Sequence, residues 1–158
     1  MLNKRLTPLQ AWEKIKYYCA YQERGHQETK DKLYKFGLNT SDVDELLARL
    51  IEEGYLNEER FARMFVGGKF RQKKWGKIKI LSELKGKRVS PYNIKIAMKE
   101  IDEEAYQSVL EKLVAEKWVS LKGEQYLVRQ MKTLRYMVQK GYEMNLVSAA
   151  IQKLRADA

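Results

Sequence analysis

Apolar side chains recur along this chain every three or four residues, which is the spacing of one face of an α-helix. The stretch that follows Ser41 is an example, because its apolar residues form a single helical stripe. They are Val43, Leu46, Leu47, Leu50 and Ile51. No stretch shows the sustained alternation of apolar and polar residues that is typical of a β-strand. The pattern therefore predicts an all-α protein.

Capping residues predict where the helices begin and end. Thr7, followed by Pro8 and Gln10, predicts an N-cap and a capping box for a helix that runs to about residue 23. Gly37 is expected to end a second helix (about 27–36) in the left-handed region. Further helices are predicted to start at Ser41, Asn57, Ile78, Ser90 and Glu103, followed by two at about 124–139 and 144–154.

The apolar pattern repeats within the chain, as it does in proteins built from tandem helical modules. One set of positions recurs 51 residues later, and part of it recurs 104 residues later. The first recurrence pairs Gly25, Leu33, Leu38, Val43, Leu47 and Leu50 with Gly76, Leu84, Val89, Ile94, Met98 and Ile101. The second pairs Gly37, Leu38, Val43, Leu47 and Leu50 with Gly141, Tyr142, Val147, Ile151 and Leu154. We therefore expect three three-helix repeats, at 1–53, 54–102 and 103–158.

The composition is that of a folded, soluble chain. Of the 158 residues, 44% are hydrophobic, which is enough apolar material for a core, and only two are proline. No apolar run approaches the roughly 18 residues that a membrane span requires, and the N-terminus lacks the apolar block of a signal peptide. We expect a cytoplasmic protein without membrane contact. A single cysteine, Cys19, excludes an internal disulfide.

The net charge of +10 is concentrated in the middle of the chain. Residues 60–99 contain 13 Lys or Arg and one acid, Glu83, whereas the rest contains 18 basic and 20 acidic residues. A solvated surface usually mixes both signs, so this segment indicates a polyanionic partner, nucleic acid or a protein bound to it. On a helical wheel Arg60, Arg63, Arg71 and Lys74 share one arc, and Gly67 between them is expected to let a phosphate backbone approach.

Further residues extend this predicted interface. Aromatic residues at helical spacing are more often core than base-stacking residues, but Trp75 follows Lys74 at a helix end and is expected to be exposed. The complete candidate set for DNA or filament binding is Arg60, Arg63, Arg71, Lys73, Lys74, Trp75, Lys77, Lys79, Lys87 and Arg88.

Catalysis and metal binding have little support in the sequence. The only histidine, His26, follows Gly25 at a predicted helix start, which favours a structural role over that of a general base. One Cys and one His do not make a thiolate or imidazole metal site. Gly67, Gly68 and Lys69 lack the spacing of a phosphate-binding loop. We therefore expect no enzyme, no metal and no cofactor.

The middle segment also carries a specific motif: an aromatic–aliphatic pair, two acids, a basic residue and Phe-Ala, and then Gly-x-x-x-Ile-x-x-Glu-Leu. The residues are Gly54, Tyr55, Leu56, Asn57, Glu58, Glu59, Arg60, Phe61, Ala62, Gly76, Ile80, Glu83, Leu84 and Val89. This motif resembles that of the RecX regulatory proteins. Asn57 stands where that family usually has Asp, and Arg88 stands where a glycine is expected before Val89.

The resemblance implies three tandem three-helix repeats, similar in plan to helix-turn-helix domains, in an elongated, curved array. It also implies a monomer that binds the RecA filament on single-stranded DNA, with weaker binding to duplex DNA. Such a protein inhibits the recombinase, ATPase and coprotease activities and so regulates recombination, DNA repair and the SOS response. We expect Arg60, Arg63, Arg71, Lys74 and Lys77 to carry most of the binding. Two alternatives remain open: an autonomous helix-turn-helix DNA-binding protein, and a scaffold that binds another protein without nucleic acid.

Overall fold

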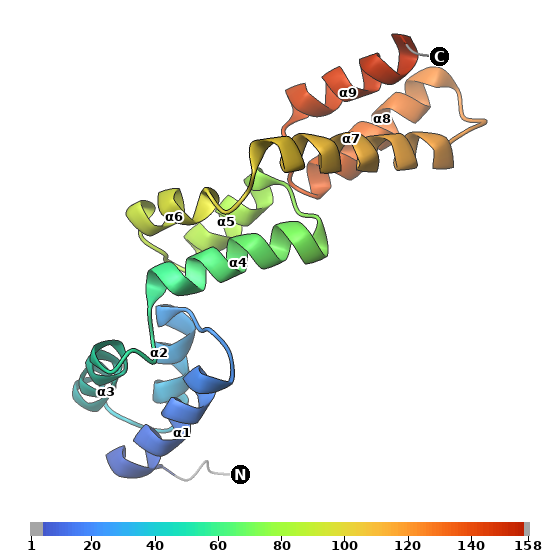
Figure 1. Ribbon diagram of the computed structural model, residues 1–158. Helices are drawn as coiled ribbons and strands as arrows, with labels where there is room; N and C mark the ends of the chain where they lie inside the picture. Colours follow the sequence, from blue (N-terminus) through green and yellow to red (C-terminus); the bar gives the residue numbers. More distant parts are fainter. Residues whose placement is uncertain (1–4, 157–158) are drawn as a thin grey trace. The chain divides into compact units, whose positions relative to one another are not determined.

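The computed structural model describes residues 5–156, and all regular secondary structure within them is helical (Figure 1). This confirms the prediction of an all-α fold. The helices of the described residues are α1 (Pro8–Tyr21), α2 (His26–Lys35), α3 (Thr40–Glu52), α4 (Glu58–Lys73), α5 (Lys77–Gly86), α6 (Pro91–Met98), α7 (Glu103–Ser120), α8 (Tyr126–Gln139) and α9 (Met144–Ala156). None of these helices is long and apolar enough to cross a membrane.

Most of the predicted caps are confirmed by hydrogen bonds. Thr7 and Gln10 form the reciprocal capping box of α1, with N···O distances of 3.2 and 3.0 Å. Asn57 Oδ1 accepts from the backbone N–H of the third residue of α4 at 2.9 Å, and Ser90 Oγ accepts from the equivalent N–H of α6 at 3.3 Å. Each cap satisfies a backbone donor that the first helical turn leaves without a partner.

The predicted cap of α3 is wrong. Asn39 Oδ1 accepts from the backbone N–H of Asp42 at 2.8 Å, so α3 begins at Thr40 and Ser41 lies inside its first turn. Both Asn and Ser are good N-caps, and they stand two residues apart in the sequence. Asn39 is the N-cap, and its backbone has the extended conformation typical of that position, with φ −78° and ψ 169°.

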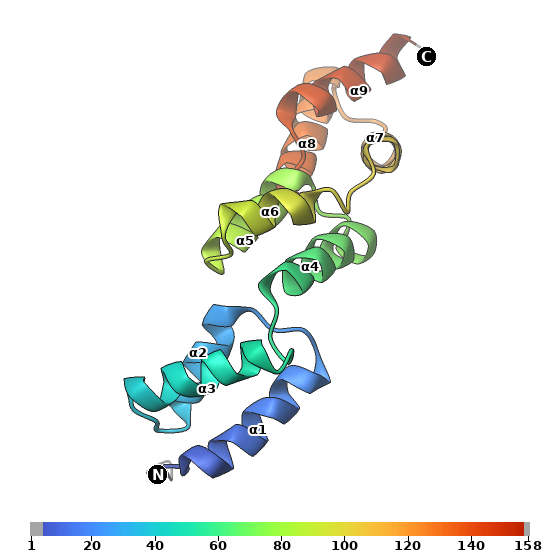
Figure 2. The ribbon, with the colours of Figure 1, turned by 60° about the vertical axis from the view of Figure 1, so that its left-hand side comes forward.

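The described residues form two compact units. The first contains the residues up to Phe65 together with Leu84–Ala97. In it α1, α2 and α3 pack against one another (Figures 1 and 2). Their shared core consists of Ala11, Trp12, Ile15, Cys19, Leu33, Leu38, Val43, Leu46, Leu50 and Leu56. These include most of the first-repeat positions singled out by the sequence pattern.

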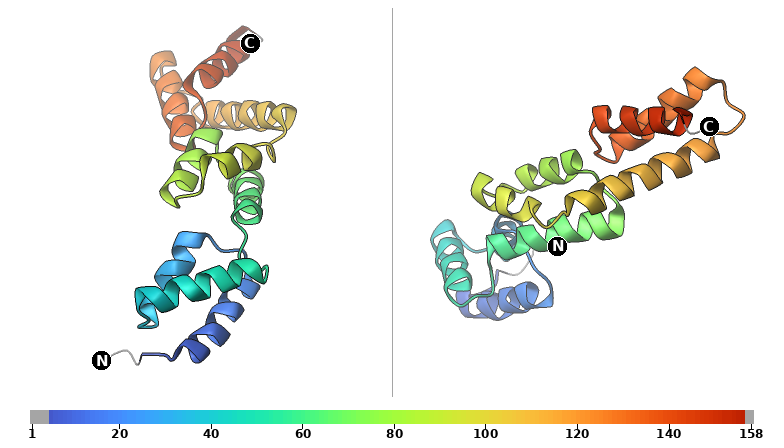
Figure 3. Two further views of the ribbon diagram at one scale, coloured as in Figure 1. Left: turned by 90° about the vertical axis from the view of Figure 1, so that its left-hand side faces the viewer. Right: turned by 45° about the horizontal axis from the view of Figure 1, so that its top comes forward.

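The second unit contains Val66–Glu83 and the described residues from Met98 onward. Helices α7, α8 and α9 pack side by side in it (Figure 3). Its core includes three neighbouring aromatic rings: Tyr106 stacks on Tyr142 with a centroid distance of 5.3 Å, and the tilted ring of Phe70 lies 5.8 Å from that of Tyr106. Because the predicted middle repeat contributes to both units, the boundaries of the three repeats stay a prediction.

Equivalent positions in the repeats adopt the same unusual backbone conformation. Gly37 and Gly141, which the sequence pattern pairs, have φ of +87° and +99°. Arg88 takes the corresponding place in the middle repeat and has φ +59°. The turn that follows the second helix therefore keeps its left-handed residue in each repeat, although one of the three is not a glycine.

Candidate nucleic-acid interface

In the first unit, two of the predicted contact residues are held in ion pairs. The Arg60 guanidinium pairs with Glu23 and also donates to the carbonyl oxygen of Gly54 at 3.0 Å. Arg63 pairs with Glu59, one helical turn earlier, at 3.0 Å. A phosphate would have to compete with these carboxylates. The guanidinium groups of Arg60 and Arg63 are therefore less available for binding than the sequence indicates.

Lys87 and Arg88 lie in the same unit at the end of α5. Arg88 is exposed, and Lys87 is partly buried with its Nζ 5.8 Å from the centroid of the Phe65 ring. The left-handed backbone of Arg88 is fixed by two hydrogen bonds, from its own N–H to the carbonyl of Lys85 and from Val89 N–H to that of Leu84. The turn therefore presents the Arg88 guanidinium to solvent.

The second unit carries the larger group of candidate residues, at the end of α4. Arg71, Lys73 and Lys74 are exposed there. Lys74 has φ +59°, and its carbonyl oxygen accepts a hydrogen bond from the Tyr142 hydroxyl at 2.9 Å. Tyr142 thus holds the backbone of Lys74, whereas Arg71 and Lys73 project from the last turn of α4.

The expected approach at Gly67 is wrong. A Cβ placed on Gly67 would collide with the guanidinium of Arg71, so that side chain lies back across the glycine. Because Gly67 and Arg71 are one helical turn apart, the missing side chain makes room for the arginine rather than for a phosphate backbone. The guanidinium itself remains at the surface.

Trp75 lies between two lysines in the turn from α4 to α5. Lys69 Nζ is 4.8 Å and Lys79 Nζ is 4.2 Å from a centroid of the indole, which are cation–π distances. The side chain is partly buried, whereas the sequence predicts an exposed one. Trp75 therefore holds the charges of two lysines near this turn, and its own ring is partly covered.

Lys77 is tied into the core of the second unit. Its Nζ pairs with Glu103 at 2.6 Å and lies 4.6 Å from the centroid of the Tyr106 ring. Its backbone N–H donates to the Tyr106 hydroxyl at 3.0 Å, and that hydroxyl donates to Glu143. Burial and the hydrogen bond to Glu143 raise the pKa of Tyr106 well above its usual value, so the hydroxyl stays a donor. These contacts give Lys77 a structural role.

The structure therefore gathers the candidate residues into two groups, one in each unit. The group in the second unit is Arg71, Lys73, Lys74, Trp75, Lys77 and Lys79. The group in the first unit is Arg60, Arg63, Lys87 and Arg88. Arg71, Lys73, Lys74 and Arg88 are exposed and, within residues 5–156, form none of the ion pairs seen at Arg60, Arg63 and Lys77. They are therefore the strongest candidates for phosphate contacts.

Two tyrosines of α1 do not belong to the core, although aromatic residues at helical spacing are more often expected there. Trp12 is buried, as core aromatics are expected to be, but Tyr17 and Tyr21 are 73% and 71% exposed. The signal was present in the spacing: Ile15 and Cys19 continue the buried stripe of α1, and the two tyrosines fall outside it. Tyr17 and Tyr21 line a pocket of the first unit.

The described residues contain no group of three or more His, Cys, Asp or Glu side chains that could hold a metal ion. Burial raises the pKa of the Cys19 thiol, which disfavours the reactive thiolate. His26 Nδ1 lies 3.9 Å from Glu58, in a contact that joins α2 to α4. The candidate residues supply positive charge, and the tyrosines of α1 supply exposed aromatic surface; both features can bind a ligand.

Comparisons with known proteins identify the fold and the family. The family model described as "RecX, second three-helix domain" matches residues 57–98, and "RecX, third three-helix domain" matches residues 103–151. A crystal structure of RecX from Lactobacillus salivarius has a TM-score of 0.83, with 19% sequence identity over 94% of this chain and 97% of that one. A crystal structure titled regulatory protein RecX also scores 0.83, at 17% identity. These two likenesses show the fold.

Relatives named "Regulatory protein RecX" align along most of the chain. The protein from Oceanobacillus iheyensis is 25% identical over 98% of this chain and 57% of its own length. The protein from Lactococcus lactis subsp. lactis is 25% identical over 89% and 53%, and the one from Amycolatopsis mediterranei 25% over 94% and 87%. The chain thus spans just over half the length of the first two relatives. The two matched domains make up more than half of this chain, which belongs to the RecX family.

Proposed function

We propose that this chain regulates the RecA recombinase by binding its filament on single-stranded DNA and inhibiting the recombinase, ATPase and coprotease activities. Membership of the RecX family supports the choice of partner. The observation that carries the proposed binding site is the exposed, acid-poor cluster at the end of α4, formed by Arg71, Lys73 and Lys74. Cations on a fixed backbone suit the phosphates of a filament-bound strand.

The ion pairs narrow the set of side chains that would carry this binding. Arg60, Arg63 and Lys77 each have an acidic partner within the chain, so binding through them would require those pairs to be broken. We assign the main contribution to Arg71, Lys73 and Lys74, with Arg88 as a separate contact in the first unit. Several modest contacts on successive subunits of a filament would add up through avidity.

The test is the single-stranded-DNA-dependent ATPase of the cognate RecA, titrated with this chain from far below to equal stoichiometry. We expect inhibition by the unaltered chain. Inhibition well below one chain per RecA would indicate end-capping or propagated disassembly. No effect on the ATPase, with DNA binding intact, would contradict the proposal and favour an autonomous DNA-binding protein.

A matched pair of charge-reversal variants locates the site. The triple variant Arg71→Glu, Lys73→Glu and Lys74→Glu should lose inhibition while its circular dichroism stays helical. The control triple Lys112→Glu, Lys122→Glu and Arg135→Glu changes the net charge equally at exposed positions outside the basic segment and should still inhibit. Equal loss in both triples would mean that only the overall charge matters, and would overturn the assignment of the site.

A further inference from the structure

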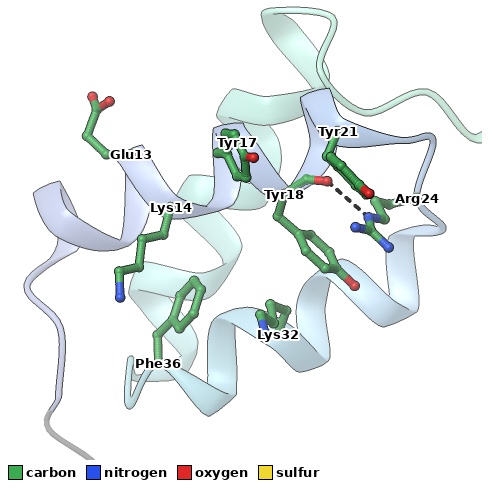
Figure 4. A pocket seen from close by; sticks show the side chains of 8 residues that line it. All are labelled: Glu13, Lys14, Tyr17, Tyr18, Tyr21, Arg24, Lys32 and Phe36. Atoms are coloured by element: carbon green, nitrogen blue, oxygen red, sulfur yellow. Dashed lines mark hydrogen bonds between the residues drawn. The ribbon is translucent and has the colours of Figure 1, made fainter.

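A pocket of about 640 Å³ lies between α1 and α2 in the first unit, outside the basic segment of the sequence (Figure 4). Tyr18 extends from α1 toward α2, Lys32 approaches from α2, and Phe36 approaches from the position just after that helix. Tyr17 and Tyr21 line the same pocket from α1. Neither the family comparison nor the charge distribution accounts for this collection of aromatic and basic side chains.

The exposed tyrosines form a stacking surface. Tyr17 and Tyr21 are one helical turn apart, their ring centroids are 6.4 Å apart, and the ring planes are inclined by 29°. They are about 70% exposed, whereas α1 contributes to the core of the unit through a different stripe, which includes Ile15 and Cys19. These rings therefore contribute little to folding and leave apolar faces open to a ligand.

The polar side chains of the pocket are mainly cationic. Lys14, Arg24 and Lys32 line it, and the Arg24 guanidinium lies 3.8 Å from the centroid of the Tyr18 ring. Arg24 Nε also donates to the Tyr18 carbonyl oxygen at 3.0 Å, which fixes the arginine at one end of the pocket. The acid that lines the pocket, Glu13, pairs with Lys16 at 3.0 Å, so its charge is already balanced.

We propose that this pocket binds an unpaired nucleotide of single-stranded DNA, with the base against the rings of Tyr17 and Tyr21 and the neighbouring phosphates at Lys14 and Lys32. Stacking platforms combined with a basic groove are the usual means of holding a single strand without sequence preference. An acidic peptide would satisfy the cations but would leave the ring faces uncovered. The nucleotide uses both features of the pocket.

The proposed site does not require the recombinase. It deepens the proposed function by adding a direct contact to the strand, and its role in a filament rests on that function. The binding itself is a property of the chain alone and is measured without RecA. A failure of this proposal and a failure of the ATPase test are therefore distinguishable.

Photo-crosslinking tests the position of the base. The full chain is irradiated with a single-stranded oligonucleotide that contains 5-iododeoxyuridine, digested with trypsin and analysed by mass spectrometry. Cleavage after Lys16 and Arg24 places all three tyrosines in one peptide, Tyr17–Arg24, which we expect to carry the crosslink. A crosslink confined to other peptides, such as one that contains Trp75, would overturn the proposal.

Binding to two oligonucleotides tests the stacking. The double variant Tyr17→Ala and Tyr21→Ala should bind fluorescent oligo(dT) about tenfold more weakly, as expected for lost base–aromatic stacking. The same variant should bind an abasic oligonucleotide of equal length with unchanged affinity, because that strand has no bases to stack. The control Tyr34→Ala and Tyr92→Ala removes exposed tyrosines elsewhere in the unit and should bind both normally. Unchanged affinity of the Tyr17/Tyr21 variant, equal loss for both oligonucleotides, or equally effective competition by polyglutamate would each contradict a nucleotide site.

Discussion

Two glycines that the sequence pattern treats as equivalent, Gly25 and Gly76, have different surroundings. Gly25 precedes α2, and a Cβ placed on it would lie 3.3 Å from the nearest ring atom of Phe61. Gly76 precedes α5, and a Cβ there would collide with the backbone of Gly141 and Tyr142. The same pattern position thus supports a contact with a side chain in one unit and with backbone in the other.

The surrounding polar contacts differ in the same way. Near Gly25 the elements are joined by side chains, through the pair of Arg60 with Glu23 and the approach of Glu58 to His26. At Gly76, backbone hydrogen bonds join the second and third repeats: Gly76 N–H donates to the Lys140 carbonyl at 2.7 Å, and Ile78 N–H donates to that of Gly141 at 2.9 Å. Side chains can change rotamer, whereas two backbones in contact have little freedom to adjust.

The largest expected effect that tests this comparison comes from Gly76→Ala. The new methyl group would separate the two backbones and break their hydrogen bonds, so we expect a loss of about 3 kcal/mol in the free energy of unfolding. The matched change Gly25→Ala should cost about 1 kcal/mol or less, because the Phe61 ring can move by a few tenths of an ångström. Urea denaturation followed by circular dichroism measures both. Equal losses would show that the two junctions are alike.

A smaller effect is expected at Glu58, which connects the start of α4 to the start of α6. Its Oε1 accepts from the backbone N–H of Ser90 at 2.9 Å and from the side-chain amide of Asn93 at 2.8 Å. Burial opposes ionisation, but these hydrogen bonds and nearby His26 outweigh it and lower the pKa of the carboxyl below its usual value. The ionised form is therefore bound more tightly in the folded protein than in the unfolded chain.

The stabilisation from Glu58 should depend on pH in one direction. With a folded pKa below the unfolded one, the contribution is complete above the unfolded pKa of about 4.3 and is lost as the pH falls through the folded pKa. We expect Glu58→Gln to cost about 1–2 kcal/mol at pH 7. The difference from the unaltered chain should shrink when urea denaturation is repeated below about pH 4. A difference that stays constant with pH would contradict this role.

The sequence predicted local features better than distant contacts. The caps at Thr7, Asn57 and Ser90 could be predicted because each depends on residues three positions away. Arg60 and Glu23 are 37 positions apart, so helical spacing alone does not indicate that the Arg60 guanidinium is already held in an ion pair. The exposed tyrosines of α1 were indicated by their position outside the buried stripe, but the pocket beside them depends on how α2 packs.

The smallest expected effect concerns Arg88, where the middle repeat differs from the other two. A residue with a Cβ is strained in the left-handed region, and Gly37 and Gly141 avoid that strain at the equivalent positions. Arg88→Gly should therefore raise the free energy of unfolding by about 0.5–1 kcal/mol, the relief of strain exceeding the added entropy of the unfolded chain. Arg88→Ala keeps the Cβ and should give no such gain.

If the Arg88 guanidinium contacts the filament as proposed, both variants should weaken ATPase inhibition equally, although only the glycine variant is stabilised. Equal stability of the two variants would contradict the strain, and unchanged inhibition would remove Arg88 from the interface.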